Sequence, residues 1–173
     1  LRVYEWDLIQ SGRVYGLIAM LAGSAGVLSG PIVLRLMSDN EIRAPHFKLA
    51  IFGISMATLS LIMLPFQPNV NIALIFVTLA SFFVTLPLAG TSSAMVIVSP
   101  NRIRGVITGI YVVVTSVFGL VLGPFLVASS TDFIFQDPTA IAKSLALVSI
   151  LIGPIGIFFM LKGINYFGEM KNV

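Results

Sequence analysis

The distribution of charge along this chain leaves little choice of fold. Four stretches contain no Asp, Glu, Lys, Arg or His, namely Val14–Leu34, Leu49–Asn101, Gly105–Thr131 and Ser144–Leu161. A helix of about 20 apolar residues crosses the hydrocarbon core of a bilayer, so each stretch is long enough for at least one crossing. The pattern therefore predicts a membrane-embedded helical protein.

The composition excludes the soluble alternatives. Of the 173 residues, 57% are apolar and 10% are charged, and the mean hydropathy is +1.03. Soluble domains carry about 25% charged residues, so this chain cannot cover its surface with charge. A soluble domain, a disordered chain and a nucleic-acid partner are excluded, and the lipid bilayer is the expected partner.

The second charge-free stretch is too long for one crossing, because it contains 53 residues. It breaks at 65–69, where Pro65 and Pro68 flank Gln67 and favour a turn. The sequence thus predicts an all-α polytopic membrane bundle, in which residues 1–173 form part of one transmembrane domain. The five predicted spans are about 12–36, 47–66, 70–97, 103–129 and 139–162.

Capping residues predict several helix ends. Ser11 is expected to cap the first helix, and Asn101 is expected to cap the fourth. Asp137 precedes Pro138, a combination that suits the start of the fifth helix. Gly163 is expected to end that helix.

The basic residues predict the orientation, because cytoplasmic loops of membrane proteins carry an excess of Lys and Arg. One side of the predicted bundle has seven: Arg35, Arg43, Lys48, Arg102, Arg104, Lys162 and Lys171. The other side has three: Arg2, Arg13 and Lys143. The C-terminus is therefore expected in the cytoplasm and Leu1 outside. An odd number of spans that starts outside leads us to expect an earlier helix before Leu1.

Small residues and prolines predict where helices pack closely or break. Small residues recur at helical spacing in the first and fourth predicted helices, at Ala19, Gly23, Gly26, Gly30, Gly119 and Gly123. They let helix backbones approach each other in lipid. Pro124 is expected to bend the fourth helix, and Pro87 to interrupt the third near mid-membrane. Interrupted helices beside a cavity are typical of transporters.

Three short motifs carry a family resemblance, at residues 99–105 (SPNRIRG), 119–124 (GLVLGP) and 130–132 (STD). They are similar to the region from the tenth to the eleventh helix of the major facilitator superfamily of transporters, and in particular of its spinster-like branch as found in bacteria. The segment 30–36 resembles the family's Gly-x-x-x-Asp-Arg signature. Leu34 stands where the Asp usually is and Arg35 where the Arg is, which puts a gating salt bridge at this position in doubt.

The resemblance implies that the five helices are the eighth to twelfth of twelve. It implies a secondary transporter that works by alternating access, in a bacterial inner or other plasma membrane. The expected partners are the missing N-terminal half and a small organic or amphipathic solute. A coupling ion would have to bind elsewhere, because no span carries a charge at mid-depth.

Two polar stripes are the candidate cavity lining under this interpretation. They are Thr78, Ser81, Thr85 and Ser92 on the third helix, and Thr108, Tyr111 and Thr115 on the fourth. Their hydroxyls could contact a neutral solute. They could equally bond to carbonyls of their own helix or join neighbouring helices. Arg35, Arg102 and Arg104 are candidates for a cytoplasmic gate, or for a simpler role in topology and lipid contact.

Two other classes of protein are alternatives to a transporter. An enzyme is not expected, because His46 is the only histidine and lies at the membrane interface, and the sequence shows no metal-ligand cluster or phosphate loop. No metal and no cofactor are expected. A membrane-embedded structural or assembly subunit stays open as the alternative to a transporter, since nothing in the composition excludes it.

Overall fold

The computed structural model describes residues 7–40, 44–88, 90–91, 99–137 and 140–170. Every element in these ranges is helical. The first helix comprises α1 (Leu8–Ile18), a π-helical segment (Ala19–Gly23) and α2 (Ser24–Asp39), which run on continuously. The second is α3 (Pro45–Met63), which ends in a 3₁₀ turn at Leu64–Phe66 and is followed by α4 (Val70–Thr85).

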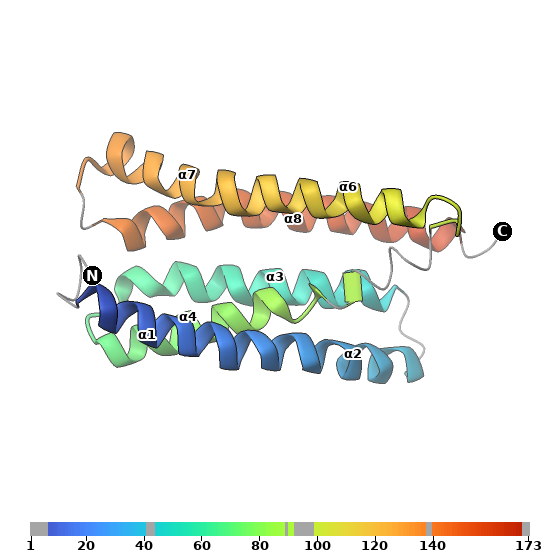
Figure 1. The fold of residues 1–173 in the computed structure, drawn as a ribbon, viewed down its shortest axis with the longest axis horizontal. Coiled ribbons are helices and arrows are strands. Elements are labelled where there is room, and N and C mark those ends of the chain that lie inside the picture. Colours follow the sequence, from blue (N-terminus) through green and yellow to red (C-terminus); the bar gives the residue numbers. More distant parts are fainter. Residues whose placement is uncertain (1–6, 41–43, 89, 92–98, 138–139, 171–173) are drawn as a thin grey trace.

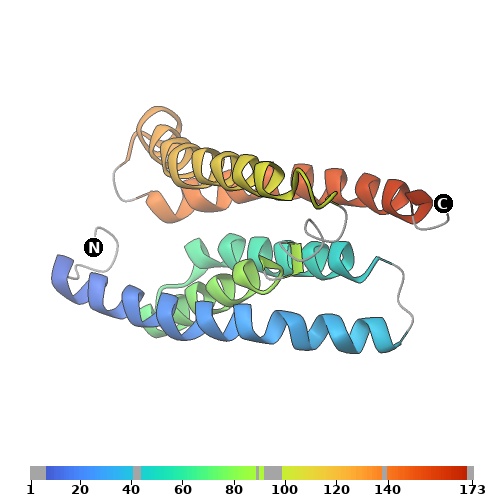
Figure 2. The same cartoon turned by 45° about the vertical axis from the view of Figure 1, so that its right-hand side comes forward.

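The second half of the chain forms one long hairpin. Its first arm comprises α6 (Arg104–Ser116), a π-helical segment (Val117–Leu122), α7 (Gly123–Ser129) and a second π-helical segment (Ser130–Phe135). Its second arm is α8 (Ile141–Met170). Figure 1 shows this hairpin above a layer formed by α1, α2, α3 and α4, with all long helices roughly parallel. Figure 2 shows the same two layers after a turn of 45° about the vertical axis.

Four helices are long and apolar enough to cross a membrane. They are Ile9–Asp39, Pro45–Phe66, Arg104–Phe135 and Ile141–Ile164. The protein is therefore an all-helical membrane protein, as the charge-free stretches predict. The predicted span 70–97 is different, because α4 ends at Thr85 and has only 16 residues. The part of this span at 89 and 92–97 lies outside the described residues.

α3 lies at the centre of the bundle and packs against α4 on one side and α8 on the other. Glycines make both contacts close. A Cβ on Gly53 of α3 would lie 2.7 Å from the Phe83 carbonyl oxygen of α4. A Cβ on Gly153 of α8 would lie 2.7 Å from Thr58 Oγ1 of α3. Small residues thus replace large apolar side chains as the packing device, as expected between membrane helices.

The helix ends differ from the capping predictions. α1 begins at Leu8, so Ser11 lies within the helix instead of capping it. α6 follows Ile103 without a side-chain cap, so Asn101 does not cap it either. α8 begins at Ile141, and it continues through Gly163 to Met170. Gly163 serves close packing instead, because a Cβ there would lie 2.7 Å from the Phe47 ring of α3.

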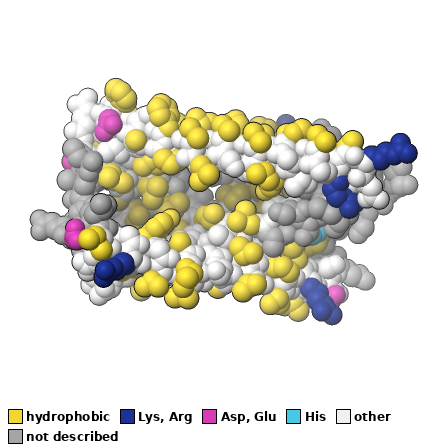
Figure 3. Space-filling view, viewed as in Figure 1, with side chains coloured by type: hydrophobic (Ala, Val, Ile, Leu, Met, Phe, Trp, Pro, Cys, Tyr) yellow, Lys and Arg dark blue, Asp and Glu magenta, His cyan; other side chains and the backbone are white. Residues whose placement is uncertain are grey.

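The two ends of the bundle differ in charge. α2 and α8 finish, and α3 and α6 begin, at the same end (Figure 1). The described basic residues at or near that end are Arg35, Lys48, Arg102, Arg104 and Lys162, whereas those at the other end are Arg13 and Lys143. Figure 3 shows most of the visible Lys and Arg side chains at this one end. The excess of Lys and Arg that the sequence predicts for one side is thus found at one end of the folded bundle.

Single cysteines should test this arrangement, because the chain has no cysteine of its own. Asn40→Cys and Asn101→Cys lie at the basic end, and Asn71→Cys and Gln136→Cys at the other; all four positions are exposed. In intact cells an impermeant maleimide should label only the second pair, and the first pair only after permeabilisation. If the two cysteines of one pair reacted from different sides of the membrane, the fold would be contradicted.

Candidate functional site

Two residues of the polar stripe of α4, Thr78 and Thr85, have their hydroxyl groups satisfied within their own helix. Thr78 Oγ1 donates to the Leu74 carbonyl oxygen at 2.7 Å. Thr85 Oγ1 lies 3.0 Å from the Ser81 carbonyl oxygen and 3.1 Å from that of Phe82. Such back-bonding removes the need for an external partner. Ser81 is half-buried, and Ser92 lies outside the described residues.

Thr85 lies at the closest contact between α2 and α4. A Cβ on Gly26 would overlap Thr85 Oγ1 and would lie 2.5 Å from the Phe82 carbonyl oxygen. Gly23 and Gly30 are buried on the same helix, and the Thr85 methyl group lies 3.8 Å from a Cβ built on Gly23. Thr85 is thus placed in a helix–helix contact and not beside an open cavity.

The polar stripe of α6 is not brought together with that of α4. Thr108 Oγ1 donates to the Arg104 carbonyl oxygen at 2.9 Å, and Thr115 Oγ1 to that of Tyr111 at 2.7 Å. Thr108 and Thr115 are exposed, and Tyr111 is half-buried. Among the described elements, α6 contacts only the π-helical segment that continues it. The two stripes therefore line no common space in this structure.

The helix that α6 and α7 form together, the α6–α7 helix (Arg104–Phe135), also carries its glycines and proline away from other helices. A Cβ on Gly119 or Gly123 would meet no atom within 4 Å, and Pro124 is exposed. No residue in the most apolar 18-residue window of this helix is buried. These residues thus differ from Gly23, Gly26 and Gly30, which lie inside the bundle.

α4 is interrupted inside the bundle, at buried Leu86 and Pro87. Proline has no N–H, so the Phe83 carbonyl oxygen loses its normal helical donor at this point. Helical hydrogen bonding resumes directly afterwards, since the Thr91 N–H donates to the Pro87 carbonyl oxygen at 2.9 Å. The backbone of Gly53 packs against the freed Phe83 oxygen. The break predicted from Pro87 is therefore present.

The candidate gate residues lie at the same end of the bundle but make few contacts. Arg35 and Arg102 are exposed. Arg104 donates from Nη2 to the Ser99 carbonyl oxygen at 3.5 Å, and its Nε is buried without a partner. No ion pair joins these arginines to another described residue.

A cavity that the sequence did not indicate lies between α1, α4 and the start of α8. Its volume is about 200 Å³. The lining residues are Ser11, Val14, Tyr15, Ile18, Leu64, Val70, Ala73, Leu74, Val77 and Ala142. None of the six predicted lining residues that the structure describes belongs to this set. The set combines residues from four helical segments, so no single motif could have revealed it.

A polar contact that the sequence also did not indicate joins the two arms of the hairpin. Thr131 Oγ1 and Ser144 Oγ lie 2.8 Å apart, at hydrogen-bond distance. Each also lies beside the carbonyl oxygen four residues earlier, Thr131 at 2.9 Å from that of Val127 and Ser144 at 3.2 Å from that of Ala140. Ser144 is fully buried. Resemblance to a family marked residues 130–132, but only the fold brings them next to Ser144.

Comparisons with known protein families, with curated proteins and with solved structures give no match to this chain.

The α2–α4 contact predicts a strong effect of side-chain size at Gly26. Gly26→Leu should lower the free energy of unfolding by about 2 kcal/mol, because the new side chain has no space beside Thr85. Gly16→Leu is the matched control, since nothing lies within 4 Å of a Cβ there, and it should change stability by less than about 0.5 kcal/mol. Unfolding in mixed micelles measures both. If the two substitutions lowered the free energy of unfolding equally, Gly26 would not lie in a close helix contact.

The hydroxyl pair predicts a measurable coupling between the hairpin arms. In a double-mutant cycle, Thr131→Val and Ser144→Ala should couple by about 0.6 kcal/mol, the average for interhelical hydrogen bonds in membranes, and by no more than about 1.7 kcal/mol. Ser149→Ala serves as the control partner for Thr131→Val, because Ser149 bonds only to the Leu145 carbonyl oxygen of its own helix. That cycle should give a coupling near zero.

Proposed function

We propose that this chain is the C-terminal part of a spinster-like transporter of the major facilitator superfamily. It would move a small organic or amphipathic solute by alternating access, as a secondary active or facilitative transporter. The proposal places it in a plasma membrane, such as a bacterial inner membrane, with the basic end of the bundle and the C-terminus in the cytoplasm. It rests on the resemblance at residues 99–105, 119–124 and 130–132.

The observation that carries the proposal is the interruption of α4 at Leu86 and Pro87. A helix broken inside a membrane bundle is expensive unless neighbouring groups satisfy its backbone. Transporters use such breaks to form a binding region and to let parts of a helix move separately. Here the break lies in the core of the layer, where Leu86 packs with Leu34 and Leu49.

The charge pattern supports an uncharged or amphipathic solute. The described charged residues lie toward the ends of the spans, and none lies at mid-depth. A fully charged solute would need an opposite charge on its path through the hydrocarbon region. A coupling ion, if transport is driven, would bind outside this chain.

One observation favours the alternative, a structural or assembly subunit that transports nothing. No residue in the most apolar window of the helix formed by α6 and α7 is buried, and such a surface can bind a helix of another membrane protein. The two functions differ in whether the polar stripe of α6 contacts water.

Thiol labelling in the complete protein distinguishes them. Under alternating access, Thr108→Cys and Thr115→Cys should react with a small impermeant thiol reagent from both sides of the membrane. Val113→Cys is the matched control, because it lies on the opposite face of α6 and is equally exposed, and it should react from neither side.

Absence of labelling at both threonine positions, in protein that is folded and correctly inserted, would overturn the transport proposal. It would favour the assembly subunit, in which a partner helix or lipid covers α6. Labelling from one side only would also contradict alternating access.

A further inference from the structure

The small-residue face of the first helix is longer in the sequence than in the packed structure. Small residues follow one another at steps of four, three, four, three and four, at Gly12, Gly16, Ala19, Gly23, Gly26 and Gly30. These steps place all of them on one face of a regular α-helix. In the structure only the last three are buried, whereas the first three are exposed.

The π-helical segment Ala19–Gly23 separates the two halves of this face. In a π-helix the N–H bonds to the carbonyl five residues earlier instead of four, so the segment contains about one residue more than an α-helical turn. One extra residue rotates α1 by about 100° relative to α2. A Cβ on Gly12 or Gly16 therefore meets no atom within 4 Å, although Gly23 and Gly26 lie against Thr85 of α4.

A proline does not account for this π-helical segment. The segment Val117–Leu122 lies just before Pro124, where the missing N–H disturbs the helical bonding. After Gly23 the next proline is Pro31, about two turns further along the helix. The segment Ala19–Gly23 instead lies where the side chains that face α4 change from large to small.

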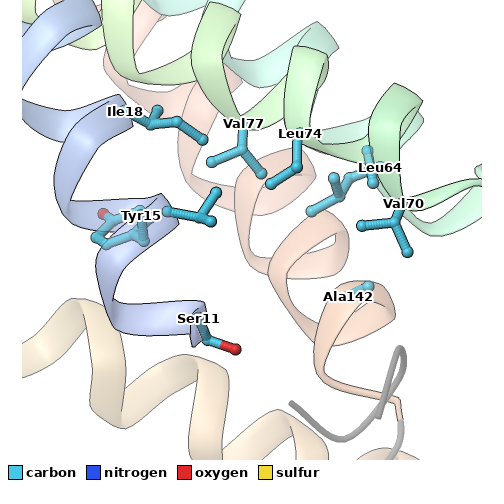
Figure 4. Close-up of a pocket in the computed structure, with 10 residues that line it drawn as sticks. Ser11, Tyr15, Ile18, Leu64, Val70, Leu74, Val77 and Ala142 are labelled. Atoms are coloured by element: carbon cyan, nitrogen blue, oxygen red, sulfur yellow. The ribbon is translucent and has the colours of Figure 1, made fainter. Parts of the chain in front are cut away.

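Larger side chains of α1 face α4 in place of the first glycines. Figure 4 shows Ile18 of α1 opposite Val77 and Leu74 of α4. Ile18 also lines the cavity between α1, α4 and α8, together with Val14 one turn earlier. α1 packs against α4 less extensively than α2 does. The cavity of about 200 Å³ thus lies where the large side chains, and not the glycines, face α4.

We propose that α1 has two orientations against α4, of which the structure shows one. In the second orientation the extra residue of Ala19–Gly23 has moved to the start of α1, and α1 has rotated by about 100° about its own axis. Gly12, Gly16 and Ala19 then face α4, and their small size lets α1 approach it and close the cavity.

The rotation leaves the backbone paired within the bilayer. As the extra residue moves along α1, each step exchanges a bond to the carbonyl five residues earlier for a bond to the carbonyl four residues earlier. No N–H group has to stay without a partner in the hydrocarbon region, where that would be costly. The proposal rests on the first helix and its contact with α4, and it does not depend on transport.

Disulfide formation with one cysteine on α4 distinguishes the two orientations. The test uses the complete protein in membranes, with no other cysteine, and oxidation by copper phenanthroline. The first pair is Ile18→Cys with Val77→Cys, which face each other in the structure (Figure 4). The second pair is Ala19→Cys with Val77→Cys; Ala19 is exposed in the structure and would face Val77 only after the rotation. Both pairs should form disulfides.

Two changes should restrict α1 to the orientation in the structure. Deletion of Leu21 removes the extra residue, so that a regular helix keeps the present faces of α1 and α2. Gly16→Leu places a large side chain on the face that would approach α4, and the structure has open space there. Each change should lower the disulfide yield of the second pair by about fivefold or more, because the second orientation then requires a compressed turn or an overpacked contact.

The first pair is the internal control, because its disulfide yield should stay the same in both variants. Gly156→Leu on α8 is the control for the added side chain. A Cβ at Gly156 also meets no atom within 4 Å, and this substitution should change the yield of neither pair.

A disulfide in the first pair but not in the second would overturn the proposal, and a helix of the complete protein that permanently covers Gly12 and Gly16 would give this result. A yield of the second pair that deletion of Leu21 leaves unchanged would also overturn it, because ordinary mobility would then explain that disulfide. Absence of both disulfides would contradict the contact between α1 and α4, and the proposal with it. None of these results bears on the transport proposal, which the thiol labelling tests separately.

Discussion

The requirement that every backbone N–H and C=O finds a partner inside the bilayer governs this structure. It forces the described residues of the spans into helices, and many hydroxyls on these helices donate to carbonyl oxygens of the same helix, as at Thr78 and Thr115. Where Pro87 removes a donor, the chain brings the backbone of Gly53 against the freed Phe83 oxygen. The break in α4 and the close approach of α3 therefore occur together, at the same carbonyl group.

Four of the five spans could be predicted because hydrophobic length is a property of the sequence itself. The stretch Gly105–Thr131, for example, contains no charge, and it lies within the membrane-length helix Arg104–Phe135. The helix ends were harder to predict, because outside the hydrocarbon core a helix can continue or stop at a similar cost in free energy. Ser11 is a good capping residue, yet α1 begins one turn earlier, at Leu8. Gly163 resembles a helix end, yet it lies inside α8 against Phe47.

The candidate site was only partly predictable, for a different physical reason. Spacing in the sequence shows which residues share a face of a helix, but not which neighbour that face meets. Thr85 shares a face with Thr78, and the fold turns this part of the face toward Gly26. The Pro87 break could be foreseen, because its cause is local. The cavity beside Ser11 could not, because its lining comes from segments that only the fold brings together.

The attachment of the α6–α7 helix gives the molecule a mechanical asymmetry. This helix runs from Arg104 to Phe135 as 32 residues, or about 48 Å, and among the described elements it is held by α8 only near its end, where Thr131 meets Ser144. The contacts of α7 and of Ser130–Phe135 with α8 therefore fix the direction of the whole arm. For this length, a change of about 10° in that direction displaces the Arg104 end by about 8 Å.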